Sequence, residues 1–327
     1  SGTVDVTSRQ ITLSGTRIYN GSTTVQSSEL SIFSNIVSGE TLALSGSGSV
    51  ATANVSSGKA VTLGTISLVD NTANASNYSL VSATLDVTER PINLTSTRSY
   101  DGASTTDSSN ISLSNLINTE TLNLSGTISH SSSNAGIYST NDINTTSLNL
   151  SDGSNGGLSA NYTLSGGTHS LTVTKKSLGL SGSRTYDGSL NASSSDLSLS
   201  GLVGGQTLVL SGTGTIASPN VQAGKLVSVG TLSITDGTGL SSNYELSDSF
   251  TLDVTARPIT ATGSKIYDGS NVVSGSNISS FSNLVGSETL SATGNGTVAS
   301  SNVGAGKTVT LNTLALSLIH ISEPTRH

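Results

Sequence analysis

The chain has 327 residues, with 13 basic and 20 acidic side chains, a formal net charge of −7 and no cysteine. This acidic balance leaves no basic surface of the kind that nucleic acid or an anionic membrane requires, so we expect neither as a partner. Disulfides and thiolate metal sites are excluded, and no apolar run approaches the roughly 18 residues that would suggest a membrane-spanning helix.

Four copies of one tyrosine motif divide the chain into repeats. The motif is a basic residue, any residue, Tyr, Asp or Asn, and Gly, and its tyrosines are Tyr19, Tyr100, Tyr186 and Tyr267. They lie 81, 86 and 81 positions apart. A Glu or Gln follows each of them after 20 or 21 positions, and an Asn-Tyr pair follows three of them after a similarly constant interval. Such fixed spacing predicts a tandem array of one structural unit.

The repeat pattern assigns the segments of the chain in order from the N-terminus. Residues 1–8 match the closing segments 82–88 and 248–255, so we expect them to be the last strand of a truncated upstream repeat. The units follow with almost no linker: repeat 1 at 9–89, repeat 2 at 90–175, repeat 3 at 176–256 and a truncated repeat 4 at 257–315. Residues 316–327 resemble the translation of a sequencing adapter, so we expect a non-native tail there. Each complete repeat is long enough to hold its own small core.

Apolar and polar residues alternate within the repeats, as is typical of β-strands with one buried face. In repeat 1, Val61 and Leu63 lie on one face of the predicted strand. The alternation of apolar and polar residues then slips by one position, so that Ile66 and Leu68 are the next apolar residues on this face. The residues at this slip in three repeats are Gly64, Gly230 and Asn312. Gly and Asn tolerate positive φ, so we predict β-bulges at these three positions.

The expected fold class is all-β. Each repeat contains six or seven short strands, separated by Gly, Asn and Ser, and no sustained helical period. This pattern predicts a tandem array of immunoglobulin-like antiparallel β-sandwiches. The alternative is a β-grasp-like repeat, which needs a helix. Its only candidate helix is the polar stretch after the tyrosine motif, residues 193–202 in repeat 3.

The tyrosine motif itself predicts a corner of the fold. Asp-Gly and Asn-Gly are strong turn signals, and a Tyr just before the turn can bury its ring while its hydroxyl finds a partner. We expect the basic residue to lie along that ring. The alternative is that the tyrosines form a stacking platform for sugar rings. The candidate structural residues are Tyr19, Gly21, Tyr100, Asp101, Gly102, Tyr186, Asp187, Gly188, Tyr267, Asp268 and Gly269, with Tyr78, Tyr162 and Tyr244 of the Asn-Tyr slot.

Together, the Tyr-Asp-Gly motif, the segment 201–234, the Asn-Tyr slot and the closing "TARPIT" resemble the YDG-type repeats of large bacterial surface proteins, such as filamentous-haemagglutinin-like adhesins. The resemblance covers nearly the whole chain to about Ala315. Asn20 departs from the motif, and repeat 2 lacks the Gly-Lys pair found at Gly58 and Lys59. The resemblance implies an extracellular or cell-surface location and a role in adhesion or in spacing an adhesive tip.

The sequence gives little support for catalysis or for metal binding. Outside the predicted tail the histidines are His130 and His169, which are not repeated, and no nucleophile or phosphate-loop motif is present, so we expect no enzyme and no cofactor. Calcium is the one alternative, at loops that contain Asp70, Asp152 and Asp236. Each loop offers a single carboxylate, and calcium usually takes more, which favours plain turns.

The leading hypothesis is therefore a non-catalytic stalk of a secreted bacterial adhesin, in which each repeat has its neighbours as partners. Pro91 in the junction between repeats 1 and 2 restricts the backbone and should limit swinging of these units. Two alternatives stay open: the repeats bind host glycan or protein through variable loops, or they are accessory modules of a secreted carbohydrate-active enzyme.

Overall fold

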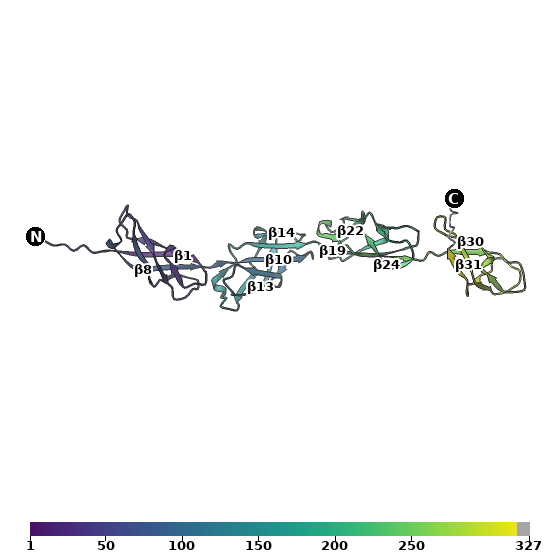
Figure 1. Cartoon of the computed structure of the whole chain (residues 1–327), viewed down its shortest axis with the longest axis horizontal. Coiled ribbons are helices and arrows are strands. Elements are labelled where there is room, and N and C mark those ends of the chain that lie inside the picture. Colours follow the sequence, from purple (N-terminus) through teal and green to yellow (C-terminus); the bar gives the residue numbers. More distant parts are fainter. Residues whose placement is uncertain (319–327) are drawn as a thin grey trace, which may run out of the picture. The chain divides into compact units, whose positions relative to one another are not determined.

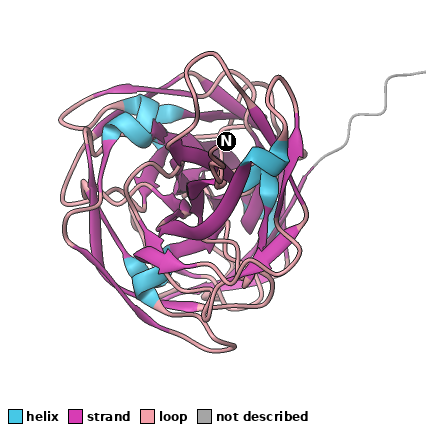
Figure 2. Ribbon diagram, turned by 90° about the vertical axis from the view of Figure 1, so that its left-hand side faces the viewer, coloured by secondary structure: helices cyan, strands magenta, loops and turns pink. Residues whose placement is uncertain are grey.

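The computed structural model describes residues 1–318, and these residues form an all-β protein. They contain 34 strands and eight 3-10 turns of three residues each, but no α-helix. The short cyan helices in Figure 2 are 3-10 turns. The stretch 193–202, the candidate helix of the β-grasp alternative, consists mainly of the turn Ser194–Asp196 and the strand β21 (Leu197–Ser200). The predicted all-β class is confirmed, and the helix of the alternative is absent from the described residues. The chain divides into two compact units, unit 1 (Ser1–Lys176) and unit 2 (from Ser177 onward).

Repeat 1 shows the arrangement of strands most completely. A four-stranded sheet has the order β3-β1-β8-β6, and two-stranded sheets pair β2 with β5 and β4 with β7. The strands are β1 (Arg9–Ile18), β2 (Thr24–Gln26), β3 (Leu30–Ser34), β4 (Leu42–Ser45), β5 (Ser47–Ser49), β6 (Ser56–Ala60), β7 (Ser67–Asp70) and β8 (Tyr78–Thr88). The turns are Ser27–Glu29 and Ala75–Asn77.

The first and last strands of a repeat lie side by side and parallel. β1 pairs with β8 in this way, with Gly15 opposite Leu85 and Arg17 opposite Val87 (Figure 1). The same parallel pairing joins β10 (Asn93–Ser99) to β18 (His169–Thr174) and β19 (Lys176–Thr185) to β27 (Phe250–Thr255). The prediction of antiparallel sheets is therefore wrong for this central pair. Alternation of apolar residues indicates which face of a strand is buried, but it does not fix the direction of the neighbouring strand.

Repeat 2 has more and shorter strands. They are β9 (Arg90–Pro91), β10 (Asn93–Ser99), β11 (Thr105–Asp107), β12 (Ile111–Ser114), β13 (Leu122–His130), β14 (Gly136–Ser139), β15 (Ile143–Asn144), β16 (Leu148–Asp152), β17 (Tyr162–Thr163) and β18 (His169–Thr174). Its turns are Ser108–Asn110, Thr140–Asp142 and Ser159–Asn161. The order β12-β10-β18-β14 keeps the parallel central pair.

Repeats 3 and 4 make up unit 2. The strands of repeat 3 are β19 (Lys176–Thr185), β20 (Asn191–Ser193), β21, β22 (Leu208–Ser211), β23 (Thr213–Ile216), β24 (Gln222–Ser228), β25 (Ser233–Asp236), β26 (Tyr244–Leu246) and β27 (Phe250–Thr255). Those of repeat 4 are β28 (Thr260–Gly263), β29 (Val272–Ser274), β30 (Ile278–Ser282), β31 (Leu290–Thr293), β32 (Asn295–Val298), β33 (Val309–Thr310) and β34 (Ala315–Leu318). Their other turns are Ser241–Asn243 and Gly275–Asn277.

The predicted bulge residues lie in tight turns. Gly64, Gly230 and Asn312 have positive φ of 56°, 57° and 41°, as their residue types suggested. The chain around Gly64, however, is a turn closed by a hydrogen bond of 2.8 Å from the Ile66 N–H to the Leu63 carbonyl. The strand before it, β6, pairs with β8, whereas β7 after it pairs with β4. The slip in alternation thus marks a crossing between sheets, and the bulge prediction is wrong.

The two ends of the chain differ from the prediction in detail. Residues 1–8, predicted to be a strand, are extended but pair with no strand within the described chain. At the other end, Leu316–Leu318 belong to β34, which pairs with β31 as β7 pairs with β4. This strand therefore runs three residues past the predicted end of repeat 4 at 315. The rest of the predicted non-native tail, 319–327, lies outside the described residues.

Candidate functional site

The junction between repeats 1 and 2 is built around the tyrosine of the first motif. Tyr19 directly follows β1, and its N–H donates to the Thr88 carbonyl at 2.9 Å. Its side chain is only 3% exposed. The Tyr19 hydroxyl donates to Oε1 of Glu120 in repeat 2 at 2.7 Å. The other oxygen of that carboxylate, Oε2, accepts from the Tyr162 hydroxyl at 2.6 Å. One carboxylate thus joins a tyrosine from each repeat.

The two tyrosine rings also contact each other. Their centroids lie 5.5 Å apart with planes at 80°, an edge-to-face arrangement that aromatic pairs prefer. The Tyr162 hydroxyl in turn accepts the Ile117 N–H at 3.0 Å, and the Glu120 N–H closes a turn onto the Ile117 carbonyl at 3.0 Å. These bonds position the Glu120 carboxylate within repeat 2.

Glycine in the motif allows the close approach of the next repeat. Gly21 has φ of +72°, which side-chain-bearing residues rarely adopt. A Cβ atom on Gly21 would lie only 2.7 Å from Cγ2 of Ile117. The turn itself is held by the Asn20 side chain, whose Oδ1 accepts the Ser22 N–H at 3.0 Å. Gly21 therefore serves both the turn and the packing between repeats.

Two further side chains connect repeats 1 and 2. Asn161, directly before Tyr162, is 1% exposed, and its Oδ1 accepts the Val55 N–H at 2.9 Å. Arg90 donates to the carbonyl of Asn115 at 2.7 Å and to its Oδ1 at 2.6 Å. The same guanidinium reaches the Tyr19 carbonyl at 3.4 Å. Sequence reasoning missed Glu120, Asn161 and Arg90 as junction residues, although the constant spacing of their slots was visible.

Unit 2 contains the same junction between repeats 3 and 4. The Tyr186 hydroxyl donates to the Glu288 carboxylate. A Cβ atom on Gly188 would lie 3.0 Å from Cγ1 of Val285, in the position that Ile117 takes beside Gly21. Arg257 donates to the Asn283 carbonyl at 2.7 Å, as Arg90 does to Asn115. The tyrosine–glutamate bond, the glycine contact and the arginine contact of the junction therefore occur in both units.

The remaining predicted tyrosines occupy related places. Tyr78 and Tyr244 are buried and donate to Glu40 and to Gln206 Oε1 (2.6 Å) within their own repeats, as Tyr162 does to Glu120. Tyr100 is also buried, whereas Tyr267 of repeat 4 is 62% exposed.

The other motif residues form the predicted turns. Gly21, Gly102, Gly188 and Gly269 all have positive φ, between 72° and 81°. Asp101, Asp187 and Asp268 each accept a backbone N–H two residues further on, at 2.8 to 2.9 Å, and each pairs with the basic residue of its motif. The basic side chains also donate to carbonyls of the turn, as Arg98 does to Ala103 at 2.6 Å, a role that sequence reasoning had not assigned.

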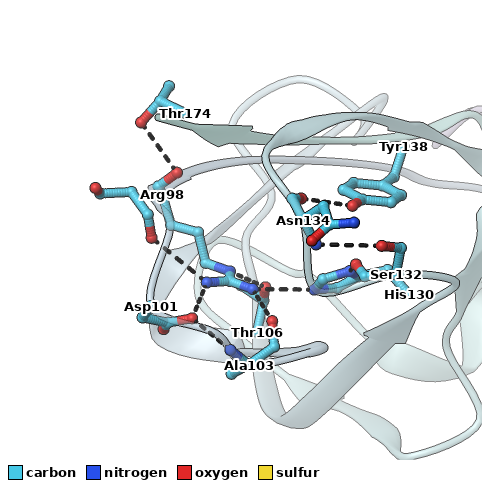
Figure 3. Close-up of polar contacts among 10 residues, drawn as sticks. Arg98, Asp101, Ala103, Thr106, His130, Ser132, Asn134, Tyr138 and Thr174 are labelled. Carbon is cyan, nitrogen blue, oxygen red and sulfur yellow. Dashed lines mark hydrogen bonds and ion pairs between the residues drawn. The ribbon is translucent and has the colours of Figure 1, made fainter. Parts of the chain in front are cut away.

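Repeat 2 adds a buried histidine to its motif (Figure 3). Arg98 Nη2 lies 3.1 Å from His130 Nε2, and His130 Nδ1 lies 2.5 Å from the Ser132 carbonyl. The guanidinium of Arg98 can only donate, so Nε2 must accept from it. The Ser132 carbonyl can only accept, so Nδ1 must carry a proton, and the imidazole is therefore neutral. Its ring centroid lies 4.7 Å from that of Tyr138, whose hydroxyl donates to the Asn134 carbonyl at 2.6 Å. Burial lowers the pKa of His130, and the charge of Arg98 lowers it further.

Acidification should weaken repeat 2 through His130. Because folding lowers the pKa of this group, its contribution to stability is complete above its usual pKa of about 6.5 and is lost as the pH falls below that value. We expect the melting temperature of the protein to drop between pH 7 and pH 5 more steeply than that of a His130→Gln variant. Equal pH dependence of the two melting temperatures would contradict this assignment.

Alkali should loosen the junction through its tyrosines. Burial, and then the hydrogen bond to Glu120, raise the pKa of Tyr19 to about 12, and the pKa of Tyr162 is raised for the same reasons. The stabilisation that these two hydroxyls give the folded protein is complete below their usual pKa near 10. It is lost as the pH rises toward 12. We expect a Tyr19→Phe variant to lose less stability than the parent between pH 9 and pH 11.5 in urea titrations. A parallel loss in both proteins would rule out this source of pH dependence.

The weak calcium candidates cap 3-10 turns. The carboxylates of Asp70, Asp152 and Asp236 accept the N–H groups of Ala75, Ser159 and Ser241 at 2.7, 2.8 and 2.7 Å, in that order. The hydrogen bonds from Ser159 and Ser241 lower the pKa values of Asp152 and Asp236. Within residues 1–318, no group of three or more His, Cys, Asp or Glu side chains is arranged to hold a metal ion.

The chain matches a known family of protein domains at three places, which correspond to its repeats. A sequence model of the YDG domain matches residues 4–85, 168–252 and 251–318, which together make up more than half of the chain. The chain belongs to the YDG domain family. The YDG matches leave out residues 86–167, most of repeat 2, where the Gly-Lys pair is missing. No curated protein matches this YDG chain. Among the described residues of the YDG chain, no helix has the length and apolar character needed to cross a membrane.

Proposed function

We propose that this YDG chain is a non-catalytic stalk segment of a secreted bacterial cell-surface adhesin, which holds an adhesive region away from the cell. The observation that carries the proposal is the buried junction in which Glu120 accepts hydrogen bonds from both Tyr19 and Tyr162. A stalk requires successive repeats to keep their relative orientation, and this junction supplies a specific contact through two buried tyrosines for that purpose.

Packing at the junction supports the same function. The hydrophobic core of repeat 1 continues without interruption into Ile92, Leu122 and Tyr162 of repeat 2. Neighbouring domains move freely by default unless their interface is large and apolar. A shared core opposes such motion, together with the hydrogen bond from Arg90 to the Tyr19 carbonyl and the one from the Val55 N–H to Asn161. The recurrence of the tyrosine–glutamate bond at Tyr186 and Glu288 extends this support to unit 2.

We also propose that each complete repeat packs its sheets face to face as an immunoglobulin-like sandwich with a parallel central pair. Buried residues from different sheets support this arrangement, because Val25 of β2 joins the same core cluster as Ile11 of β1 and Leu85 of β8. Leu42 and Leu68 of the β4–β7 sheet pack against that cluster. The core thus contains side chains from all three small sheets of repeat 1.

Replacement of the segment in the intact surface protein tests the stalk function. We expect cells that carry an unrelated rigid repeat array of equal length in place of residues 9–256 to adhere as well as the parent cells. Simple deletion of the same residues should reduce adhesion, because the adhesive region would lie closer to the cell. Loss of adhesion with the equal-length replacement would contradict the stalk and favour binding by the repeats.

Repeat 2 offers an observation that favours a binding function. It carries Ile137, which is 78% exposed, next to the buried Tyr138 and within the part that the YDG model does not match. A glycan array probed with the whole chain and with an Ile137→Asp variant separates the two functions. Saturable binding that the substitution abolishes would support host recognition, whereas no binding by either protein agrees with the stalk.

A further inference from the structure

Two tyrosines of successive repeats meet at one carboxylate in the junction. The side chains of Tyr19 and Tyr162 are buried, and their ring centroids lie 5.5 Å apart with planes at 80°. Their hydroxyls donate to the two oxygens of Glu120, at 2.7 and 2.6 Å. The hydroxyl ends of both rings are therefore directed at the same group. This arrangement satisfies two hydrogen bonds, and it also places two phenols in position to react with each other.

Oxidised phenols couple through their ortho carbons, the ring carbons next to the one that bears the hydroxyl. In the product, dityrosine, both hydroxyls lie beside the new carbon–carbon bond, and the rings are twisted out of a common plane. The junction already has both features, since the hydroxyls share Glu120 and the ring planes are steeply inclined. From 5.5 Å, the ring centroids have to approach by less than the length of one carbon–carbon bond. Coupling therefore requires only a small movement and rotation of the two side chains.

Glu120 supplies the proton acceptor that phenol oxidation requires. Loss of an electron turns a phenol into a strong acid, so its proton has to leave together with the electron. A proton acceptor acts within hydrogen-bond reach of the proton, and the Glu120 carboxylate lies within that reach of both hydroxyls. Glu120 is itself partly exposed, whereas the two tyrosines are buried. The carboxylate thus connects two buried hydroxyls to solvent.

Tyr138 of repeat 2 offers a comparison within the same chain. It is buried like Tyr19, but its hydroxyl donates to the Asn134 carbonyl at 2.6 Å (Figure 3). A backbone carbonyl is far less basic than a carboxylate. The ring of Tyr138 lies beside the imidazole of His130, at a centroid distance of 4.7 Å. Burial and an aromatic neighbour are therefore present at Tyr138, but the carboxylate and the second phenol of the junction are replaced by other groups.

We propose that Tyr19 and Tyr162 form a site of oxidative modification, at which an outer-sphere one-electron oxidant joins repeats 1 and 2 through a dityrosine bond. The oxidant takes one electron from each tyrosine in turn, and each phenolic proton passes to Glu120 and then to water. The two radicals pair their electrons in a bond between one ortho carbon of each ring. The hydrogen on each of these carbons then moves as a proton to the phenol oxygen of its ring, which restores both rings and both hydroxyls. In total the pair loses two electrons and two protons.

The bond would give this chain a covalent link that its composition otherwise excludes. The chain has no cysteine and so no disulfide. A dityrosine between residues 19 and 162 closes a long loop, and a covalent link across a long loop stabilises a protein mainly by restricting its unfolded chain. We expect the coupled protein to unfold at a higher urea concentration than the uncoupled protein.

Photo-oxidation of the whole chain tests the proposal. The probe is tris(bipyridine)ruthenium with persulfate, which generates a one-electron oxidant in a flash of light. Peptide mapping by mass spectrometry then identifies the coupled residues. We expect a peptide that joins Tyr19 to Tyr162, in at least tenfold higher yield than any coupled peptide that contains Tyr138. Because the bond forms within one molecule, its yield should not change when the protein is diluted.

Two variants separate the roles of the ring and of the carboxylate. Tyr162→Phe keeps the ring but removes the phenol, and it should abolish this coupled peptide. Glu120→Gln removes the proton acceptor and should lower the yield at least tenfold. Glutamine is compatible with this slot, since Gln206 holds it in repeat 3 and its Oε1 accepts the Tyr244 hydroxyl at 2.6 Å. Urea denaturation of both variants checks that they are folded before the flash.

Three results would overturn the proposal. The first is the absence of the Tyr19–Tyr162 peptide from the parent protein while other tyrosines are oxidised. The second is a yield that falls on dilution, which would show coupling between molecules. The third is an equal yield in the folded Glu120→Gln variant, which would remove the carboxylate from the reaction. None of these results depends on whether the protein serves as a stalk.

Discussion

Replacing Glu120 by alanine should lower the free energy of unfolding of unit 1 by about 2–4 kcal/mol, since a buried group that loses its hydrogen-bond partner costs about 1–3 kcal/mol. The substitution leaves two tyrosine hydroxyls, those of Tyr19 and Tyr162, without their acceptor. Both tyrosine side chains are buried, with only 3% of each exposed to solvent. Urea denaturation measures the change directly, as a shift in the transition midpoint.

The matched control is Glu40→Ala in repeat 1. Glu40 holds the same slot as Glu120 and accepts from Tyr78 of its own repeat, but no hydrogen bond from a second tyrosine is found at this carboxylate among residues 1–318. We expect Glu40→Ala to cost roughly half as much as Glu120→Ala, since one hydroxyl loses its partner. Equal losses from the two substitutions would show that the bond from Tyr19 contributes nothing.

Leu85→Ala should cost about 3 kcal/mol, within the range found when a buried leucine is truncated and a cavity is left. Leu85 is completely buried at the centre of repeat 1, on the strand β8 that lies between β1 and β6. The parallel pairing places it directly opposite Gly15 of β1. The measurement is again urea denaturation, with the free energy compared at a common denaturant concentration.

Val81→Ala, on the same strand, is the control for the core substitution. Val81 is 47% exposed, so its truncation should change the free energy of unfolding by no more than about 0.5 kcal/mol. If Leu85→Ala were as mild as Val81→Ala, β8 would not be the central strand of a packed core, and the description of the repeat would be wrong.

Sequence reasoning reached the features that depend on local chemistry. The Asp-Gly and Asn-Gly turns, the positive φ at Gly64 and the burial of Tyr19 follow from residue type and alternation alone. The direction of the central pair could not be reached in this way, because a strand with one buried face has the same pattern beside a parallel or an antiparallel neighbour. The phase slip at Gly64 was visible, but a bulge and a crossing between sheets produce the same slip.

The junction was missed because it depends on contacts between repeats. The constant spacing of Glu120 and of the Asn-Tyr slot showed that these residues matter in every unit, but not that Tyr19 reaches 101 positions along the chain to Glu120. A buried tyrosine needs a partner for its hydroxyl, and this requirement was recognised. Only the three-dimensional arrangement identifies that partner as a carboxylate of the next repeat.

A double-mutant cycle between Tyr19→Phe and Glu120→Ala tests the central claim, that the motif tyrosine of one repeat is bound by the glutamate of the next. Removal of the hydroxyl alone should destabilise unit 1 by about 1–2 kcal/mol in the parent. In the Glu120→Ala background, where the hydroxyl has already lost its acceptor, the same change should cost nothing or restore some stability. We therefore predict a coupling free energy of about 1 kcal/mol or more, whereas additive effects within about 0.3 kcal/mol would contradict the junction.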